Sequence, residues 1–367
     1  MHSTKERLSS YWSQIKDFLL SPIEEEFGLL TNKQQQLITT LEVIRIEDFV
    51  LPHVGVGRPP KDRRPMARAF VAKAVYGHTT TRQLLDQLQS DVRLRRICGW
   101  EKAIDVPEEW NFSRAFAEFS AIELPTIAHE SLIIKFQAER LIGHISRDST
   151  AIDAREKAIK KPKKQNKATR KRGRPKKGGE APTPKEQTRL EKQKTMTLED
   201  MVSDLPRACD IGAKKNAKGL LVCWKGYKLH IDTADGQIPI SCLLTSASVH
   251  DSQVALPLAL MTTQRVTNLY DVMDAAYDSE IIREHSKQLG HVPLIDFNHR
   301  GPNDERQFDP HEAQRYKERS TAERINARLK DEFGGVFVRV RGHSKIMAHL
   351  MFGILALTAD QLMRFVT

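Results

Sequence analysis

The segment YKERSTAERINARLK, residues 316–330, places a tyrosine, two cations and a carboxylate at fixed intervals. Tyr316, Arg319, Glu323 and Lys330 follow the pattern Y-x2-R-x3-E-x6-K. In a helix, Arg319 and Glu323 are one turn apart and Glu323 and Lys330 are two turns apart, so these three side chains share a face. We therefore predict one helix over residues 316–333. A carboxylate flanked by cations on one helix face suits chemistry on a phosphate group held by metal ions.

Two aspartates farther upstream lie where strands are predicted to end. LIGHISRDST (141–150) predicts a strand that ends at Asp148, with a turn beginning at Ser149. VTNLYDVMDAAYDS predicts a buried strand that ends near Asp274. Helical and strand patterns alternate after these segments, which is typical of an α/β fold with a mixed sheet flanked by helices. Polar residues at the carboxyl ends of such strands meet at one sheet edge.

Several neighbouring acids compete with these two aspartates when each is considered alone. Asp153 is an alternative to Asp148, and Asp271 and Asp278 are alternatives to Asp274. Phosphodiester cleavage is commonly carried out by two divalent ions held about 3.5–4 Å apart by carboxylates. Mg²⁺ prefers oxygen ligands and needs few protein groups, so the ordered set of Asp148, Asp274 and Glu323 would suffice.

The N-terminal part, residues 1–135, predicts an all-α domain: residues 1–50 have helical periodicity, Gly-Arg-Pro-Pro at 57–60 breaks it, and further helices follow. Two predicted helices, 65–75 and 80–88, are joined by a short turn at residues 76–78, with Thr79 or Thr80 as the N-cap. This pair is compatible with a helix-turn-helix and equally with a plain helical hairpin. A further helix from Pro107 carries four aromatic side chains that we expect in the core: Trp110, Phe112, Phe116 and Phe119.

Most of the net charge of +11 comes from one segment. Residues 155–177 contain 13 lysines and arginines against a single acid, Glu156. We predict a basic, disordered insertion at about 154–218 that binds polyanions. Within it, Arg172-Gly173-Arg174-Pro175, followed by Lys176 and Lys177, resembles an AT-hook. An extended Arg-Gly-Arg can enter an A·T minor groove, but non-specific phosphate binding remains an alternative.

Other features exclude some classes of protein. The four cysteines are far apart and form no zinc-ligand spacing, which indicates a reducing compartment. The N-terminus lacks the apolar core of a signal peptide. The most apolar stretch, residues 350–359, is too short to span a membrane and predicts a buried helix, so we expect no membrane contact. His250 could assist proton transfer, but a cap of the following helix through Asp251 is the favoured interpretation.

Taken together, these motifs resemble the DDE transposases of bacterial insertion sequences that carry the Y-R-E-K signature. RDSTAID (147–153) and DAAYDS (274–279) are similar to the first- and second-aspartate motifs, and the signature spacing at 316–330 is met without insertion or deletion. WKGYKLHID (224–232) is similar to the Gly-Tyr-Lys strand, and TSASVHDSQ (245–253) to the segment before a helix. The region of residues 57–100 is similar to the helical N-terminal domain of such enzymes.

The resemblance implies an RNase H-like catalytic domain at 136–367 and a helical, DNA-end-binding domain at 1–135. Asp148, Asp274 and Glu323 would be the catalytic residues and would hold two Mg²⁺ ions, with Mn²⁺ as a substitute. The implied DNA contacts are Tyr316, Arg319, Lys330 and Lys228, and the basic insertion adds Arg172, Arg174, Lys176 and Lys177.

The expected function is metal-dependent cleavage of the ends of the protein's own mobile element, followed by transfer of the 3′-hydroxyl into target DNA. The expected partners are double-stranded DNA, as terminal inverted repeats and target, and a second copy of the chain in a homodimer. The expected location is the bacterial cytoplasm, at the nucleoid. A domesticated or inactive DNA-binding relic, and an RNase H-like nuclease without strand transfer, are the alternatives.

Overall fold

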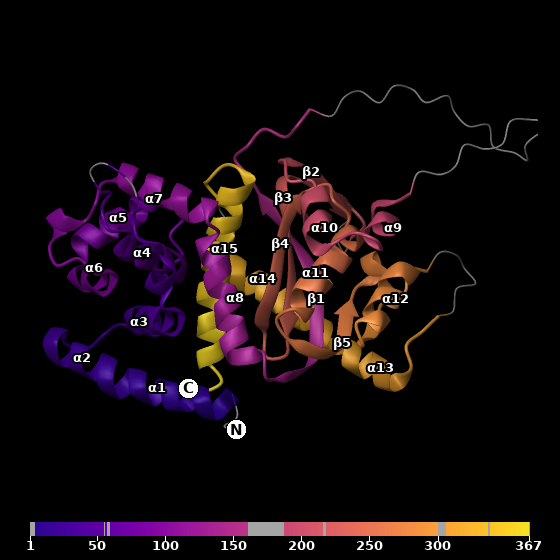
Figure 1. Ribbon diagram of the computed structural model, residues 1–367, viewed down its shortest axis with the longest axis horizontal. Helices are drawn as coiled ribbons and strands as arrows, with labels where there is room; N and C mark the ends of the chain where they lie inside the picture. The colour runs from indigo at the N-terminus through magenta and orange to yellow at the C-terminus, as the bar shows by residue number, and fades with distance from the viewer. Residues whose placement is uncertain are drawn as a thin grey trace, which may run out of the picture.

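The computed structural model describes residues 4–54, 56, 59–160, 187–215, 218–299, 306–336 and 338–366. An all-helical part of the molecule lies beside a part in which helices flank a β-sheet (Figure 1). The first part is all helical, as the periodicity predicts. Its α-helices are α1 (Thr4–Ile15), α2 (Ser21–Phe27), α3 (Asn32–Ile44), α4 (Arg63–Val75), α5 (Thr81–Ser90), α6 (Val92–Cys98), α7 (Glu109–Ala121) and α8 (Leu124–Gln137). A π-helical turn (Lys16–Leu20) and two 3₁₀ turns (Ile46–Phe49, Ala103–Asp105) connect them.

Local sequence explains how the α4–α5 pair forms. Thr80 is the N-cap of α5: its side chain accepts a hydrogen bond from the Gln83 backbone, and the Thr80 backbone donates one to Gln83 Oε1. Gly77 has a φ of +66°, which lets the chain turn between the helices. The aromatic expectation holds for three side chains of α7 and is wrong for the fourth. Trp110 is 52% exposed. Its indole donates to Glu108 on the surface.

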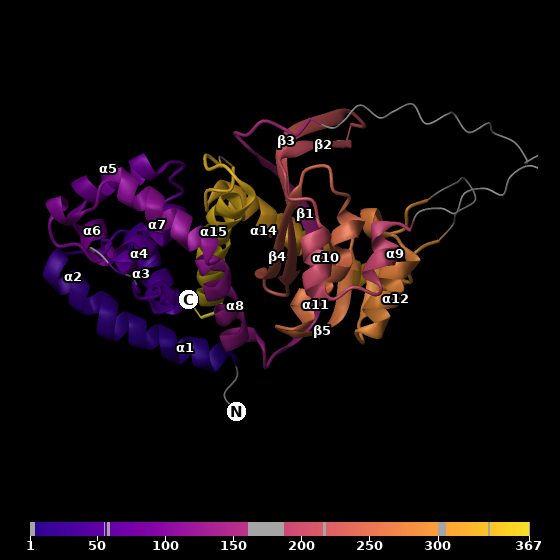
Figure 2. The same ribbon diagram turned by 45° about the horizontal axis from the view of Figure 1, so that its top comes forward.

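A mixed sheet forms the second part of the molecule. It contains β1 (Leu141–Asp153), β2 (Asp210–Lys215), β3 (Leu221–Ala234), β4 (Ile238–Ser246), β5 (Thr267–Met273) and β6 (Val292–Ile295). The strand order is β4-β3-β1-β5-β6, with β1, β5 and β6 parallel and β3 antiparallel to both of its neighbours. β2 pairs only with the first part of β3, and this hairpin stands out from the sheet (Figure 2).

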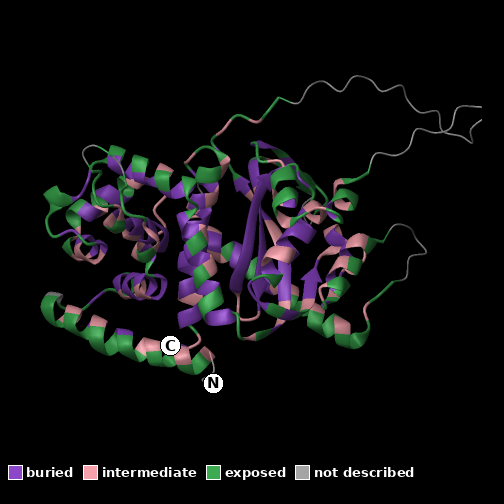
Figure 3. Cartoon of the chain, in the orientation of Figure 1, coloured by how far each residue is buried: buried purple, intermediate pink, exposed green. Residues whose placement is uncertain are grey.

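Helices cover both faces of the sheet, so the fold is the expected α/β, RNase H-like architecture. On one face lie α10 (Leu198–Asp204), α11 (Ala255–Thr263) and α12 (Glu280–Gln288). On the other lie α14 (Ser320–Asp331) and α15 (His343–Met363). α15 runs between the sheet and the N-terminal helices α3, α4, α7 and α8, and it is buried along most of its length (Figure 3).

The apolar C-terminal helix is therefore the predicted core helix. α15 is long and apolar enough to cross a membrane, but 83% of its most apolar window is buried inside the protein. A single hydrophobic core includes side chains of the N-terminal helices, of α15 and of the sheet. The division into domains at residues 135 and 136 stays a prediction.

β1 differs from the expectation. The strand does not end at Asp148; it continues through Ser149 and Thr150 to Asp153. After β5 ends, β3 still supplies a hydrogen-bonding partner to β1, up to the pair of Asp153 with Gly226. The predicted turn is therefore wrong because a neighbouring strand, remote in sequence, prolongs the ladder.

The predicted insertion is also partly wrong. Residues 187–215 contain α9 (Arg189–Gln193), α10 and β2, all of which were expected to be disordered. Two apolar side chains of this segment are buried: Met201 packs with Leu256 and Met273, and Leu205 with Leu243 and Leu258. Arg172, Arg174, Lys176 and Lys177 lie outside the described residues.

The signature segment is not one regular helix. α13 (Pro310–Tyr316) is followed by a 3₁₀ turn (Lys317–Arg319) and then by α14. Ser146 of β1 donates its hydroxyl to the Glu318 carbonyl at 2.8 Å. This hydrogen bond attaches the turn to the sheet. In a continuous α-helix, the Glu318 carbonyl would instead accept a hydrogen bond from within the helix.

Candidate active site

Asp148 and Asp274 lie level with each other on neighbouring parallel strands. The β1–β5 ladder ends with Arg147 opposite Met273, so the next residue on each chain is one of these aspartates. Asp274 is the first residue after β5, as the sequence predicts. Asp148 lies at the same height in the middle of the longer β1. The carboxyl end of β5 thus lies beside the middle of β1. Open α/β sheets bind their ligands at the carboxyl ends of their strands.

Asp148 is largely shielded from solvent, and this changes its acidity. Burial raises the pKa of its carboxyl to about 6, and the negative charges of Asp274 and Asp251 add to the rise. The Ser149 backbone and the positive charge of Arg319 oppose it. Asn326 of α14 donates its side-chain amide to Asp148 Oδ2 at 3.1 Å. Asp148 therefore faces α14, the helix that also carries Glu323.

Asp274 is held by the turn that follows it. Its Oδ1 accepts a hydrogen bond from the Ala276 backbone at 2.9 Å, which caps the 3₁₀ turn Ala275–Tyr277. Burial raises the pKa of Asp274, and the charges of Asp251 and Asp296 raise it further, against the Ala276 bond and Arg319. Two aspartates with raised pKa values side by side are a common sign of a functional centre.

Glu323 is connected to Asp148 and Asp274 indirectly, through Arg319. Arg319 Nη2 donates to Glu323 Oε1 at 2.5 Å, and the Glu323 side chain is 52% exposed. Burial lowers the pKa of the Arg319 guanidinium, but Tyr316, Glu323, Asp148 and Asp274 together raise it above its usual value. The guanidinium is therefore hydrogen-bonded to Glu323 and within electrostatic range of Asp148 and Asp274.

Two of the three predicted metal ligands are suitably placed for a cation. In the described residues, no group of three or more His, Cys, Asp or Glu side chains is arranged to hold a metal ion. Asp148 and Asp274 offer adjacent oxygen ligands whose mutual repulsion a divalent ion would relieve. Glu323 lies on the neighbouring helix and is paired with Arg319. The pair of aspartates fits Mg²⁺, and Glu323 could join it after its side chain leaves Arg319.

The predicted DNA contacts differ in their surroundings. Tyr316 packs on Phe308 at 4.9 Å between ring centroids. Burial and the charge of Asp296 raise the pKa of the Tyr316 hydroxyl. Burial also lowers the pKa of Lys330, and Lys214 of β2 lowers it further. Lys214 of β2 is therefore within electrostatic range of Lys330. It is a cation that the sequence analysis did not single out.

Lys228 has a different environment from the other predicted DNA contacts. Its Nζ donates to Asp251 Oδ1 at 2.9 Å and to the Val249 carbonyl at 2.8 Å. The side chain is 14% exposed. Asp251 begins a 3₁₀ turn (Asp251–Val254), but the cap of this turn is His250, which accepts from the Ser252 backbone. The expected cap by Asp251 is therefore wrong, because the carboxylate is turned toward Lys228.

Asp251 and Tyr277 are site residues that the sequence analysis missed. The charge of Asp251 acts on Asp148 and on Asp274. The buried hydroxyl of Tyr277 is within electrostatic range of all three aspartates. An acid two residues after the predicted strand 237–249 was a signal that could have identified Asp251, because Asp148 and Asp274 were singled out as acids at strand ends.

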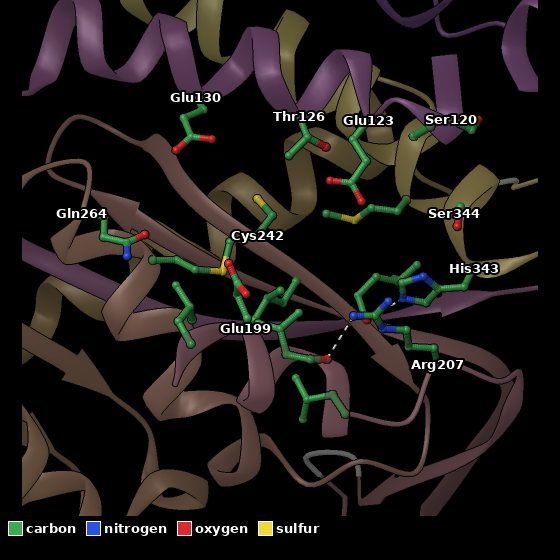
Figure 4. A pocket seen from close by; sticks show the side chains of 18 of the residues that line it. Ser120, Glu123, Thr126, Glu130, Glu199, Arg207, Cys242, Gln264, His343 and Ser344 are labelled. Atoms are coloured by element: carbon green, nitrogen blue, oxygen red, sulfur yellow. Dashed lines mark hydrogen bonds between the residues drawn. The ribbon is translucent and has the colours of Figure 1, made fainter. Parts of the chain in front are cut away.

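A cavity of about 620 Å³ lies between α8, α10, β4 and α15, away from these acids (Figure 4). Its lining includes the acids Glu123, Glu130 and Glu199, and the cations Arg207 and Arg265. None of the three predicted catalytic residues lines it. Three carboxylates in its wall disfavour a DNA phosphate, so the cavity is not part of the candidate site.

Two family models match the chain. Residues 29–136 match the Transposase domain (DUF772), and residues 206–359 match the Transposase DDE domain. The second match includes Asp274, Glu323 and the whole signature segment, and it begins after Asp148. No curated protein and no solved structure matches the chain. Enzymes of this kind act on DNA and generally use divalent metal ions. The sheet is RNase H-like, its two aspartates lie level with each other, and both family models are transposase models. The chain therefore belongs to the DDE transposases of insertion sequences.

Proposed function

We propose that this transposase cuts the ends of its own mobile element and joins the freed 3′-hydroxyl to target DNA. The observation that supports this proposal is the level placement of Asp148 and Asp274, with Glu323 across Arg319. The proposed place of action is DNA in the bacterial cytoplasm. The proposed assembly is a homodimer that bridges two element ends, in which the N-terminal helices contribute recognition of the ends.

Asp148, Asp274 and Glu323 would hold two Mg²⁺ ions; when bound, these ions would supply activation of the attacking oxygen and charge for the leaving oxyanion. In the first step, a water oxygen bonds to phosphorus, the bond from phosphorus to the 3′ oxygen breaks, and the 3′ oxygen takes a proton. In the second step, that 3′-hydroxyl attacks a phosphorus of the target, and the target's own 3′ oxygen leaves. Each step exchanges one phosphodiester bond for another bond to phosphorus, so no outside oxidant or energy source is needed.

The cations near the acids would position the DNA backbone. Arg319 offers a planar guanidinium for bidentate contact with a phosphate, and Lys330 offers a point charge. Lys214, within electrostatic range of Lys330, would extend this positive charge onto the β2–β3 hairpin. The basic segment with Arg172, Arg174, Lys176 and Lys177 would add affinity for phosphates or for an A·T minor groove.

Cleavage of DNA that carries the sequences flanking the gene tests this function. Wild-type protein is incubated with Mg²⁺ or Mn²⁺ beside Glu323→Gln, with Glu318→Gln as the control. Glu318 is an exposed acid five residues away in the same segment. We expect cuts at a defined repeat end and strand joining with wild type and control, and neither with Glu323→Gln. Cutting without joining would indicate a nuclease. Binding without cutting by wild type would indicate a DNA-binding relic and would remove the catalytic assignments.

A further inference from the structure

Asp251 is fixed on the sheet face opposite to α14 by two donors. Ser149 Oγ and Lys228 Nζ each donate to its Oδ1, both at 2.9 Å. Ser149 directly follows Asp148 on β1, and its side chain points to the opposite face of the strand. Within the described residues, Asp251 Oδ2 accepts no hydrogen bond. Asp251 therefore ties together β1, β3 and the turn before α11, immediately behind Asp148.

The negative charge of Asp251 acts on both Asp148 and Asp274. After burial, it is among the causes that raise the pKa values of Asp148 and Asp274. The turn that begins with Asp251 packs against the turn Ala275–Tyr277. Tyr277 is 1% exposed, and its hydroxyl has no hydrogen-bond partner within the described part of the chain. A buried hydroxyl without a protein partner is normally satisfied by a water or an ion, and a hydrated cation at this centre would supply such a partner.

Other charged groups around Asp251 are few. His230 Nδ1 is 3.8 Å from Asp251 Oδ1, and its Nε2 pairs with Thr245. Burial lowers the pKa of His230 to about 4, so this imidazole is neutral at pH 7.5. Lys228 is therefore the positive charge that directly balances Asp251.

We propose that Lys228 and Asp251 are a charge-balanced positioning pair that sets the affinity of the Asp148–Asp274 centre for divalent cations. This inference rests on the proposed metal-dependent function. Neither side chain ligates the ion. Asp251 holds β1 at Ser149 and adds a negative charge behind the centre, and Lys228 cancels that charge.

Loss of one partner should change cation affinity in opposite directions, depending on which partner is removed. Lys228→Gln leaves an uncompensated carboxylate and should tighten binding. Asp251→Asn leaves an uncompensated ammonium and should weaken it. One unit charge acting on a divalent ion across a solvated site corresponds to roughly a five- to tenfold change in Kd. The double variant Lys228→Gln/Asp251→Asn removes both charges and should bind close to the wild type.

The experiment is calorimetric titration of Ca²⁺ into the metal-free, full-length protein at pH 7.5. Lys228→Arg keeps the charge and should retain wild-type affinity. Lys225→Gln removes an exposed cation from the same strand and should leave the Kd unchanged. Circular dichroism of each variant verifies folding, and the double variant and Lys228→Arg provide the test if a single variant does not fold.

Each outcome bears on a different statement. Opposite shifts that cancel in the double variant would support the positioning pair. Equal weakening by both single variants, or a double variant weaker than either, would overturn it and indicate a purely structural contact. Absence of Ca²⁺ binding by the wild type, or unchanged binding by Asp148→Asn, would instead refute the metal centre of the proposed function.

Discussion

Replacement of Asp148 by asparagine should stabilise the metal-free protein at neutral pH. Folding raises the pKa of this carboxyl from 3.8 to about 6, chiefly by burial. A raised carboxyl pKa means that the folded state disfavours the ionised form. The resulting cost is absent below pH 3.8, grows as the pH rises and is complete above pH 6. A shift of about two units corresponds to about 3 kcal/mol, which is the upper limit of the gain from Asp148→Asn at pH 7.5.

The assay is thermal unfolding in EDTA at pH 7.5 and at pH 4.5, for wild type, Asp148→Asn and Asp153→Asn. For a domain of this size, 1 kcal/mol shifts Tm by about 2–4 °C, so the gain at pH 7.5 should not exceed about 12 °C. At pH 4.5 most of the gain should disappear, because Asp148 is then mainly protonated. Asp153 ends the same strand and is exposed, so its replacement should change Tm little at either pH.

Two results would refute this reasoning. One is an Asp148→Asn variant that is no more stable than the wild type at pH 7.5. The other is a gain of equal size at both pH values, which would show that charge is not its source. Addition of Ca²⁺ gives an independent check. The ion should raise the Tm of the wild type more than that of Asp148→Asn, since it binds the folded state through this carboxylate.

The remaining predictions concern the sheet and the DNA-facing cations. Arg147 and Asp232 form a buried bidentate pair at 2.7 Å, so Arg147→Met should cost about 3–5 kcal/mol of unfolding free energy in urea, and a loss below about 1 kcal/mol would contradict this. Lys330→Gln should weaken DNA binding on all sequences and reduce the salt dependence of log K by about one, as measured by fluorescence anisotropy from 50 to 200 mM salt. An unchanged dependence of log K on salt would show that Lys330 does not contact DNA.

The sequence predicts those features that depend on local pattern. The position of Asp274 follows from a buried strand that ends in a cap, and the β3–β4 hairpin follows from Ala234-Asp235-Gly236, where Gly236 has a φ of +80°. The core role of α15 follows from its uniform apolarity. The register that brings Asp148 level with Asp274 is a long-range property. It depends on β5 pairing with β1 across more than a hundred residues, and no local pattern specifies it.

The errors have the same physical origin. The segment of residues 187–215 is polar and follows a lysine-rich tract, so its few apolar side chains do not by themselves predict a folded segment. They are buried only because α11 and β4 present an apolar surface to them. Asp251 was interpreted as a cap because its nearest neighbours in sequence allow one. Its actual partners, Ser149 and Lys228, come from two other strands.

Arg319 compensates for part of the negative charge of the site in the absence of a metal ion. Its guanidinium is hydrogen-bonded to Glu323 and is within electrostatic range of Asp148 and Asp274. The same side chain is the proposed phosphate contact, and it cannot fully serve Glu323 and a phosphate at once. Entry of cations would take over the role of counter-charge, which frees Glu323 to turn toward the aspartates and Arg319 to face the DNA backbone. The 3₁₀ turn that carries Arg319 is fastened to β1 through Ser146, so this exchange requires movement of side chains and not of the sheet.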